Sequence, residues 1–383
     1  MNQMLPPLRS ETDESALAGL EAEIRTRREE FEKRGHIPRD IVNALKKIGV
    51  YRAFVPKSLG GDEISPAAFC RLIERLSQAD ASTGWVASFG ISTMYLGALP
   101  NDVFESLYRE NPNLTFAGAL FPPQAAQEMP GGLLVSGRWP YCSGCMGADL
   151  IGVGTKGSEQ TGGLPRMTVM RADQVRIDQT WDTVGLQATG SHDIVVDKVF
   201  VTHEMTFVRG GPTHRQEPIF RYPAMALAAQ VLAVVGLGTA REALDYIYAQ
   251  TSGKSSITGA PAGGTRPYLQ AGLAQAEAAL SGARAYFYDM IETAWAQILR
   301  GDKISPEMNV KLRLAATQAA HSGATAARMA FELGGTEALR RGHVLNRCLI
   351  DAAAVAQHAF IGTGTWTLAG AGLLQQPTPP GYP

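Results

Sequence analysis

Residues 132–144, GLLVSGRWPYCSG, predict a β-strand that ends in a tight loop. The apolar part is short, glycines stand at both ends of the run, and Ser143-Gly144 is a turn signal. Further short apolar runs with turn residues between them follow at residues 150–153, 167–170, 175–177 and 193–201. Several short strands in this arrangement predict a small sandwich or barrel.

The sequence on either side of this β segment has helical composition. On the N-terminal side the helical runs are residues 16–34, 41–47, a run opened by Ser65-Pro66, and 81–96. On the C-terminal side they are residues 224–250, 268–300, 305–333 and 346–373. Helices this long usually pack into a bundle. We therefore expect a mainly α, α+β fold with three domains: an N-terminal helical domain (1–113), a central β-domain (114–213) and a C-terminal four-helix bundle (214–383).

The composition excludes several classes of protein. The 383 residues carry a formal net charge of −1, and 45% are hydrophobic, so a folded globular chain without a basic nucleic-acid-binding stripe is expected. The N-terminus lacks the basic and apolar segments of a secretory signal, and the apolar stretch 224–240 is too short for a membrane span. Only four cysteines are present, so we expect a reducing cytoplasm and no disulfide framework.

Three weaker motifs favour structural roles. Cys142 and Cys145 form a CxxC without a second pair, which indicates a loop between strands more than a redox or zinc site. The glycines of GLG at 236–238 lack the third glycine of a dinucleotide-binding loop, so they predict close helix packing. No histidine pair has metal-ligand spacing, so no metal is expected. His192 is expected in an exposed loop, and His358 on a long helix.

Residues 181–193, WDTVGLQATGSHD, form the most specific string in the chain. This string resembles the W…G(M/L)…TGS-x-D signature of the acyl-CoA dehydrogenase superfamily. Other segments agree with that family in order and spacing, and the resemblance extends from about residue 18 to residue 373. These further segments are residues 55–61, 132–139, 141–144, 333–335 and 345–351. The resemblance implies the acyl-CoA dehydrogenase fold, with the β-domain lying along a flavin.

The base of the dehydrogenases is not present at either of its usual positions. Most of the family places a Glu shortly after the Asp that matches Asp351, and this chain has His358 there. The other known location matches residues 221–226, which contain no carboxylate. A general base must lie within reach of the proton that it removes, so α-proton removal lacks its base. His at the first location resembles group D, the two-component flavin-dependent monooxygenases.

This closer resemblance implies an oxygenase component that uses reduced FMN or FAD and O2. Such enzymes, which include p-hydroxyphenylacetate hydroxylases, steroid-phenol hydroxylases and indole oxygenases, act through a flavin C4a-hydroperoxide. They hydroxylate or epoxidise small aromatic substrates of the phenol or indole type. A separate NAD(P)H:flavin reductase supplies the flavin, and a cytoplasmic homotetramer is implied.

The resemblance also implies roles for individual residues. Ser143 would bond flavin N5, and His358 would orient the substrate, take its proton or hold the hydroperoxide. The residues expected to contact the flavin are Trp139, Tyr141, Ser143, Trp181, Thr189, Ser191, Arg266, Gly334 and Gly335. The residues expected to contact the substrate are Trp85, Met94, Tyr95 and His358.

Two departures from the family pattern affect these expectations. Ile350 replaces the second Arg of the R-x-x-RD segment, which removes a phosphate or subunit contact. No His follows Trp85 on its helix, so a phenolate-binding pair is incomplete, and an apolar or N-heteroaromatic substrate such as indole is as well supported as a phenol. Two alternatives stay open: an acyl-CoA dehydrogenase-like flavoenzyme with a displaced base, and a non-catalytic scaffold of the same fold.

Overall fold

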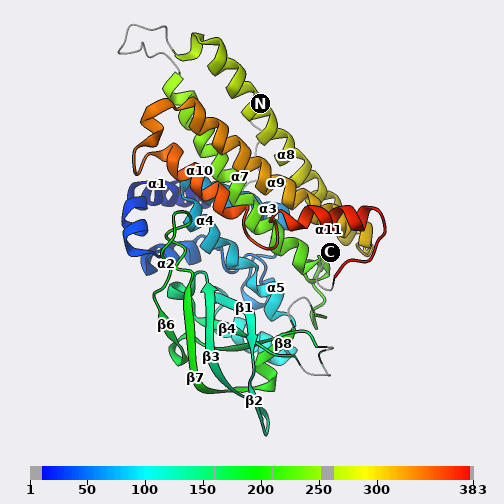
Figure 1. The fold of residues 1–383 in the computed structure, drawn as a ribbon. Helices are drawn as coiled ribbons and strands as arrows, with labels where there is room; N and C mark the ends of the chain where they lie inside the picture. The colour runs from blue at the N-terminus through cyan, green and yellow to red at the C-terminus, as the bar shows by residue number, and fades with distance from the viewer. Residues whose placement is uncertain (1–10, 158–160, 162, 209–210, 252–262, 380–383) are drawn as a thin grey trace. The chain divides into compact units, whose positions relative to one another are not determined.

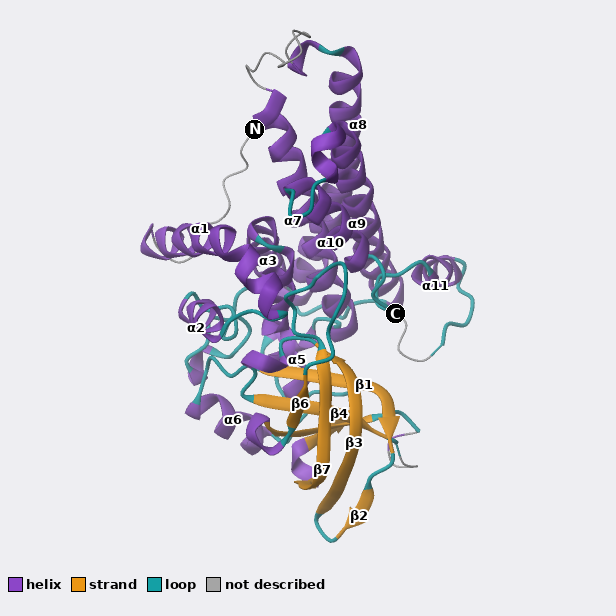
Figure 2. Ribbon diagram, turned by 60° about the vertical axis from the view of Figure 1, so that its left-hand side comes forward, coloured by secondary structure: helices purple, strands orange, loops and turns teal. Residues whose placement is uncertain are grey.

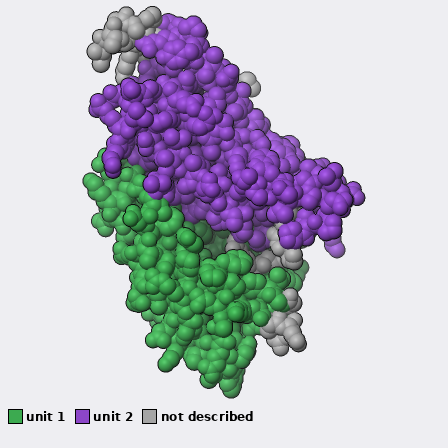
Figure 3. All heavy atoms as spheres, viewed as in Figure 1, with its two compact units in different colours: residues 1–65, 86–183, 187–224 green, residues 66–85, 184–186, 225–383 purple. Residues whose placement is uncertain are grey.

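The computed structural model describes residues 11–157, 161, 163–208, 211–251 and 263–379. The order of elements is helical, then β, then helical, as predicted (Figure 1). The chain forms two compact units, which are coloured separately in Figure 3. The first unit comprises Met1–Ser65, Val86–Thr183 and Gln187–Ala224, and the second comprises Pro66–Trp85, Val184–Leu186 and Met225–Pro383. The division into three domains at residues 113 and 213 stays a prediction.

The first unit contains the N-terminal helices that were expected from composition. Helix α2 begins after Pro38, whose extended backbone precedes the first turn, and it buries Ile41, Val42 and Leu45 on one face. The predicted run 81–96 is helical throughout but divides into three short pieces. The helices of this region are α1 (Glu11–Arg34), α2 (Arg39–Lys47), η2 (Ser88–Ile91), α5 (Ser92–Leu96) and α6 (Asn101–Glu110), together with the last two residues of α4 (Ala81–Ala87), whose first five residues belong to the second unit.

A sandwich of two four-stranded sheets forms the rest of the first unit (Figure 2). One sheet has the order β1 (Phe116–Gln124), β4 (Leu150–Thr155), β5 (Arg166–Arg171), β8 (Thr206–Val208). The other has the order β2 (Gln127–Met129), β3 (Gly132–Cys142), β7 (His192–Thr202), β6 (Arg176–Asp178). All five predicted strands are confirmed. Three further strands were not predicted: β1, β2 and β8. Strand β1 contains Gly118 and two prolines, residues that argue against a central strand but are tolerated at the edge of a sheet.

The second unit is built from long helices that run alongside one another (Figure 1). The three predicted helices at 224–250, 268–300 and 305–333 are confirmed. The fourth prediction, one helix over 346–373, is wrong, because turns over residues 356–363 divide it in two. His358 therefore lies in a turn and not on a helix. The helices are α3 (Pro66–Ala79), α7 (Ala224–Thr251), α8 (Pro267–Leu299), α9 (Pro306–Leu333), α10 (Val344–Val355) and α11 (Gly364–Leu373).

Glycines allow α7 to approach its neighbours closely, as the GLG motif predicted. A Cβ on Gly323 of α9 would lie 2.6 Å from the Gly236 carbonyl oxygen, and one on Gly238 would lie 2.2 Å from the Glu74 carbonyl oxygen of α3. The expectation that the apolar stretch 224–240 is too short for a membrane span is wrong, because α7 continues to Thr251. Among the described helices, α7 is the one long and apolar enough to cross a membrane, but 83% of its apolar window is buried inside the protein. Its hydropathy is therefore that of a core helix.

His192 is buried, and the expectation of an exposed loop residue is wrong. His192 is the first residue of β7, and 2% of its surface is exposed. Its Nδ1 accepts a hydrogen bond of 3.1 Å from the Trp181 backbone N–H. The strand pairs with Cys142 of β3 at this position, so the ring faces the protein and not solvent. Burial, and next the neighbouring His36, hold the pKa of His192 below its ordinary value.

Replacing Gly323 by Ala should destabilise the protein, and the same change at Gly282 should not. The added methyl at 323 meets the α7 backbone, and we expect the free energy of unfolding to fall by about 2 kcal/mol. Gly282 on α8 has open space at its Cβ, so Gly282→Ala should raise stability by about 0.5 kcal/mol through helix propensity. Urea denaturation of both variants measures the difference, and equal effects would refute close packing at Gly323.

The buried His192 should make stability fall with acid. Its folded pKa is depressed, so the neutral form is favoured on folding, and stability present above pH 6.5 is lost as the pH falls below that value. The contribution of one proton is at most about 1.4 kcal/mol per pH unit. Asn at this position can accept the Trp181 N–H without titrating. Denaturation at pH 7 and pH 5.5 should show a smaller loss for His192→Asn than for the wild type; parallel losses would contradict the assignment.

Candidate active site

The end of β3 turns one aromatic ring inward and the next outward. Trp139 is fully buried between the sheets, and its indole N–H donates to the Gly154 carbonyl at 2.8 Å. The pairing of β3 with β7 is irregular after Trp139, and Tyr141 takes a left-handed backbone conformation with φ of 65°. A bulge re-aims the side chains that follow it, so Tyr141 is 71% exposed although it stands two residues after a core residue. The structure thus separates Trp139 from the other predicted flavin contacts.

A row of three hydroxyl groups follows this bulge. Ser143 Oγ lies 2.6 Å from Ser191 Oγ, which lies 2.7 Å from Thr189 Oγ1. The Gly144 N–H donates to the Thr189 carbonyl at 2.8 Å, so the loop after β3 is fastened to the TGS segment by main chain as well. Thr189 and Ser191 are buried, and Ser143 is half-buried. Ser143 is therefore the end of the row that a ligand can reach.

Tyr141 and Trp181 form an aromatic pair beside this row. Their ring centroids lie 6.3 Å apart with the planes nearly perpendicular, in the edge-to-face arrangement. The Trp181 backbone is held by His192, as described above. The first unit thus brings together five residues that the sequence predicted as flavin contacts: Tyr141, Ser143, Trp181, Thr189 and Ser191.

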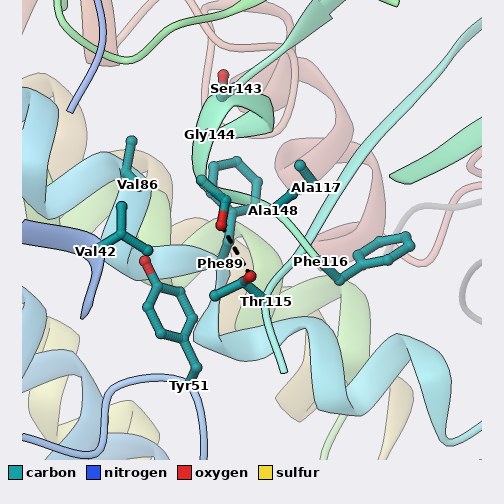
Figure 4. Close-up of a pocket in the computed structure, with 11 residues that line it drawn as sticks. Val42, Tyr51, Val86, Phe89, Thr115, Phe116, Ala117, Ser143, Gly144 and Ala148 are labelled. Carbon is teal, nitrogen blue, oxygen red and sulfur yellow. Dashed lines mark hydrogen bonds between the residues drawn. The ribbon is translucent and has the colours of Figure 1, made fainter. Parts of the chain in front are cut away.

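A narrow cavity with room for about one water-sized molecule lies next to Ser143 (Figure 4). Its walls come from α2, the α4–η2 segment, the start of β1 and the loop after β3. The residues that line it are Val42, Tyr51, Val86, Phe89, Thr115, Phe116, Ala117, Ser143, Gly144, Gly147 and Ala148. Most of these side chains are apolar, so the cavity extends a hydrocarbon surface to the edge of the hydroxyl row.

His358 lies in an aromatic cluster of the second unit. Its ring centroid is 5.6 Å from that of Trp85 and 5.1 Å from that of Phe360, both at steep angles. The Phe360 backbone N–H donates to His358 Nδ1 at 3.2 Å, which places the proton of the neutral imidazole on Nε2. The turn after α10 follows from this contact, because a side-chain acceptor competes with helical hydrogen bonding. The backbone carbonyl of Phe360 accepts a hydrogen bond from the side chain of the buried Arg313.

Asp351 fastens the short segment 184–186 to α10. Its buried carboxylate accepts the Leu186 N–H at 2.7 Å, and Gly185 leaves room for Ile350, which would otherwise lie 2.9 Å from a Cβ. The position where the family has its second Arg is thus a packing contact here. This contact links residues 185–186 to α10, which contains Arg347.

The remaining predicted residues lie elsewhere. Gly334 ends α9, where a Cβ would meet Leu345 at 2.3 Å, and Gly335 has a positive φ of 64°. Arg266 precedes α8, whose Gly272 packs on Leu333, so Arg266 and the glycine pair share one end of the bundle. Met94 is buried and Tyr95 is half-buried on α5, in the first unit, whereas His358 belongs to the second unit.

Sequence reasoning missed two aromatic residues at these sites. Phe360 stands two positions after His358, and an aromatic residue close to a candidate catalytic histidine is a usable signal. Tyr51 lines the cavity, but it precedes the VPKSLGG string without any pattern of its own. Within the described residues, no three His, Cys, Asp or Glu side chains gather as a metal site.

The chemistry of these residues fits a flavin more than a thioester dehydrogenase. A row of neutral hydroxyls beside exposed aromatic rings can bond and cover the heteroatoms and faces of an isoalloxazine. The aromatic cluster around His358 offers a planar apolar surface and one N–H donor. Neither set contains a carboxylate at the position of the dehydrogenase base.

Two family models match the chain. The model of the acyl-CoA dehydrogenase N-terminal domain matches residues 9–99, and that of the C-terminal domain matches residues 230–363. The structure is similar to the crystal structure of 3-HSA hydroxylase from Rhodococcus sp. RHA1, with a TM-score of 0.89 over 98% of this chain and 100% of that one, at 24% identity. This likeness confirms the predicted fold.

Two curated relatives identify the branch of the family. Indole-3-acetate monooxygenase of Pseudomonas putida is 50% identical over 361 residues, 94% of this chain and 92% of the relative. The oxygenase component of the FADH2-dependent resorcinol hydroxylase of Rhizobium sp. is 31% identical over 70% of this chain and 69% of the relative. The chain therefore belongs to the acyl-CoA dehydrogenase superfamily, in the branch of flavin-dependent monooxygenases that act as the oxygenase components of two-component systems.

Proposed function

We propose that this enzyme oxygenates indole-3-acetate or a closely related indole, with reduced flavin and O2. The observation that carries the proposal is the Trp85–His358–Phe360 cluster in a chain that is half identical to an indole-3-acetate monooxygenase. Offset and edge-to-face contacts between aromatic rings contribute about 0.5–1.5 kcal/mol beyond the area that they bury. A planar bicyclic substrate gains more from such walls than a phenol does.

His358 orients the substrate as a hydrogen-bond donor in this proposal. Its Nδ1 accepts the Phe360 N–H, so the neutral ring offers Nε2–H to a polar atom of the substrate. Acting as a base at Nε2 would require the other tautomer and would break the Phe360 contact. Of the roles left open by the sequence, geometry therefore favours orientation over proton removal.

The flavin contacts come from the hydroxyl row of the first unit in this proposal. Ser143 bonds the reactive edge of the ring, and Thr189 and Ser191 hold Ser143 in place. Tyr141 and Trp181 cover the ring and exclude water. Gly334, Gly335 and Arg266 bind the phosphate, and Trp139 supports the site from the core. Reduced flavin supplies the two electrons that activate O2.

A separate protein delivers the flavin in this proposal. The name of the Rhizobium relative, an oxygenase component, supports a second component that reduces flavin, and an NAD(P)H:flavin reductase is the class that fits. The proposal also includes a homotetramer in the cytoplasm, and it keeps Met94 and Tyr95 as substrate contacts. Sedimentation of the purified protein tests the tetramer.

Purified protein supplied with reduced FMN or FADH2, oxygenated buffer and indole-3-acetate should form a product that contains one added oxygen atom. Mass spectrometry with ¹⁸O2 measures the incorporation, and protein without flavin is the control. Reduction of enzyme-bound oxidised flavin by a bound CoA thioester would instead favour the dehydrogenase-like alternative. Failure to bind flavin in either redox state would favour the scaffold.

Replacing His358 by Ala should lower product formed per reduced flavin by roughly 100-fold, since the donor that orients the substrate is lost. Binding of reduced flavin, measured by fluorescence titration under anaerobic conditions, should stay within about twofold of the wild type. His358→Gln keeps an N–H donor and should retain more activity than Ala. His214→Ala, at an exposed histidine, is the matched control. If His358→Ala formed as much product per reduced flavin as the wild type, the assignment would be overturned.

A further inference from the structure

The residues that line the cavity beside Ser143 differ in burial. Ser143, Gly144 and Phe89 are half-buried, whereas Val42, Tyr51 and Thr115 are buried. Ser143 and Gly144 lie on one side of the lining, and Val42 and Tyr51 lie on the other (Figure 4). Its free space has room for about one water-sized molecule.

Most polar atoms in the wall are already hydrogen-bonded within the protein. Thr115 Oγ1 lies 2.8 Å from Asp149 Oδ2 and 3.0 Å from the Gly147 carbonyl, and it accepts the Asp149 N–H at 2.9 Å. The Gly147 carbonyl also accepts from Arg39 at 2.8 Å. Ser143 Oγ is bonded to Ser191. A water needs two to four polar partners to be held in a cavity, and these groups are occupied.

The rest of the wall is hydrocarbon or aromatic. Val42, Val86, Ala117 and Ala148 supply aliphatic surface, and Phe89 supplies an aromatic ring. Tyr51 brings a phenol whose pKa lies above its ordinary value, through burial first and then the Asp149 carboxylate, so it stays neutral. A mainly apolar wall favours an apolar gas such as xenon or O2 over a water molecule, which would need two to four free polar partners.

We propose that this cavity binds O2 and holds it next to Ser143, where it can reach the reduced flavin. The inference rests on the proposed function, because it takes Ser143 as the contact to the reactive edge of the flavin. O2 is small, apolar and uncharged, as the wall of the cavity requires. The cavity thus supplies a binding site for the second substrate that lies within a single compact unit of the chain.

Xenon tests the site without any flavin. Crystals of the wild-type protein under xenon pressure should show a xenon atom between Val86, Ala117 and Ala148. Ordered water in the cavity and no xenon would overturn the proposal.

Matched alanine substitutions on β1 test the function of the cavity. Ala117→Val adds two methyl groups to its wall, whereas Ala119→Val makes the same change two residues further along the buried face, outside the lining. In a stopped-flow mix of bound reduced FMN with buffers of increasing O2, the second-order rate of flavin oxidation should fall roughly tenfold in Ala117→Val and stay near wild type in Ala119→Val. Equal rates in the two variants would overturn the proposal.

The hydroxyl group of Tyr51, a polar atom in the cavity wall, allows a test with a second variant. Tyr51→Phe removes one oxygen atom and leaves the ring, so xenon binding and the rate of oxidation should be kept or raised. A tenfold loss would instead indicate a functional water at Tyr51 and would overturn the proposal. Failure of the proposed function looks different, because wild-type protein would then not bind reduced flavin, while the xenon result would still report on the cavity.

Discussion

The buried indole of Trp139 is the contact on which the site of the first unit depends. Its N–H bond to the Gly154 carbonyl ties β3 to the opposite sheet, inside a core where an unsatisfied donor would cost about 1–3 kcal/mol. The pairing of β3 with β7 becomes irregular immediately after this fixed point. The outward turn of Tyr141 and the loop at Ser143 come directly after that irregularity.

In the second unit, a break between two helices positions His358. A continuous helix through residues 346–373 would carry His358 on a regular face among small residues. Instead the chain leaves the helix at Val355, and His358 Nδ1 binds the backbone two residues ahead. This arrangement sets the tautomer of the ring and brings it between Trp85 and Phe360. The hydrogen bond from Phe360 to His358 thus accompanies the break in the helix and accounts for the proton that the neutral ring offers at Nε2.

The two sets of residues share a chemical character. Neutral hydroxyls, aromatic rings, one imidazole and a hydrocarbon cavity are suited to excluding water and holding uncharged reactants. A dehydrogenase acting on a thioester needs a carboxylate base instead. The same superfamily fold therefore serves oxygen chemistry here through a few side chains placed on loops and turns, and its helices and sandwich supply only the frame.

The sequence by itself determined the helical–β–helical order, the strands with regular apolar patterns and the family signature, because these depend on local periodicity and composition. It also identified Ser143 and His358 through the strings in which they stand. Only the tertiary structure decided that Trp139 faces the core while Tyr141 faces solvent, that His192 is buried, and that one expected helix breaks at His358. These features depend on contacts between segments far apart in the chain, or on a side chain that competes with backbone hydrogen bonding. Such contacts produce no periodic pattern of residues in the sequence.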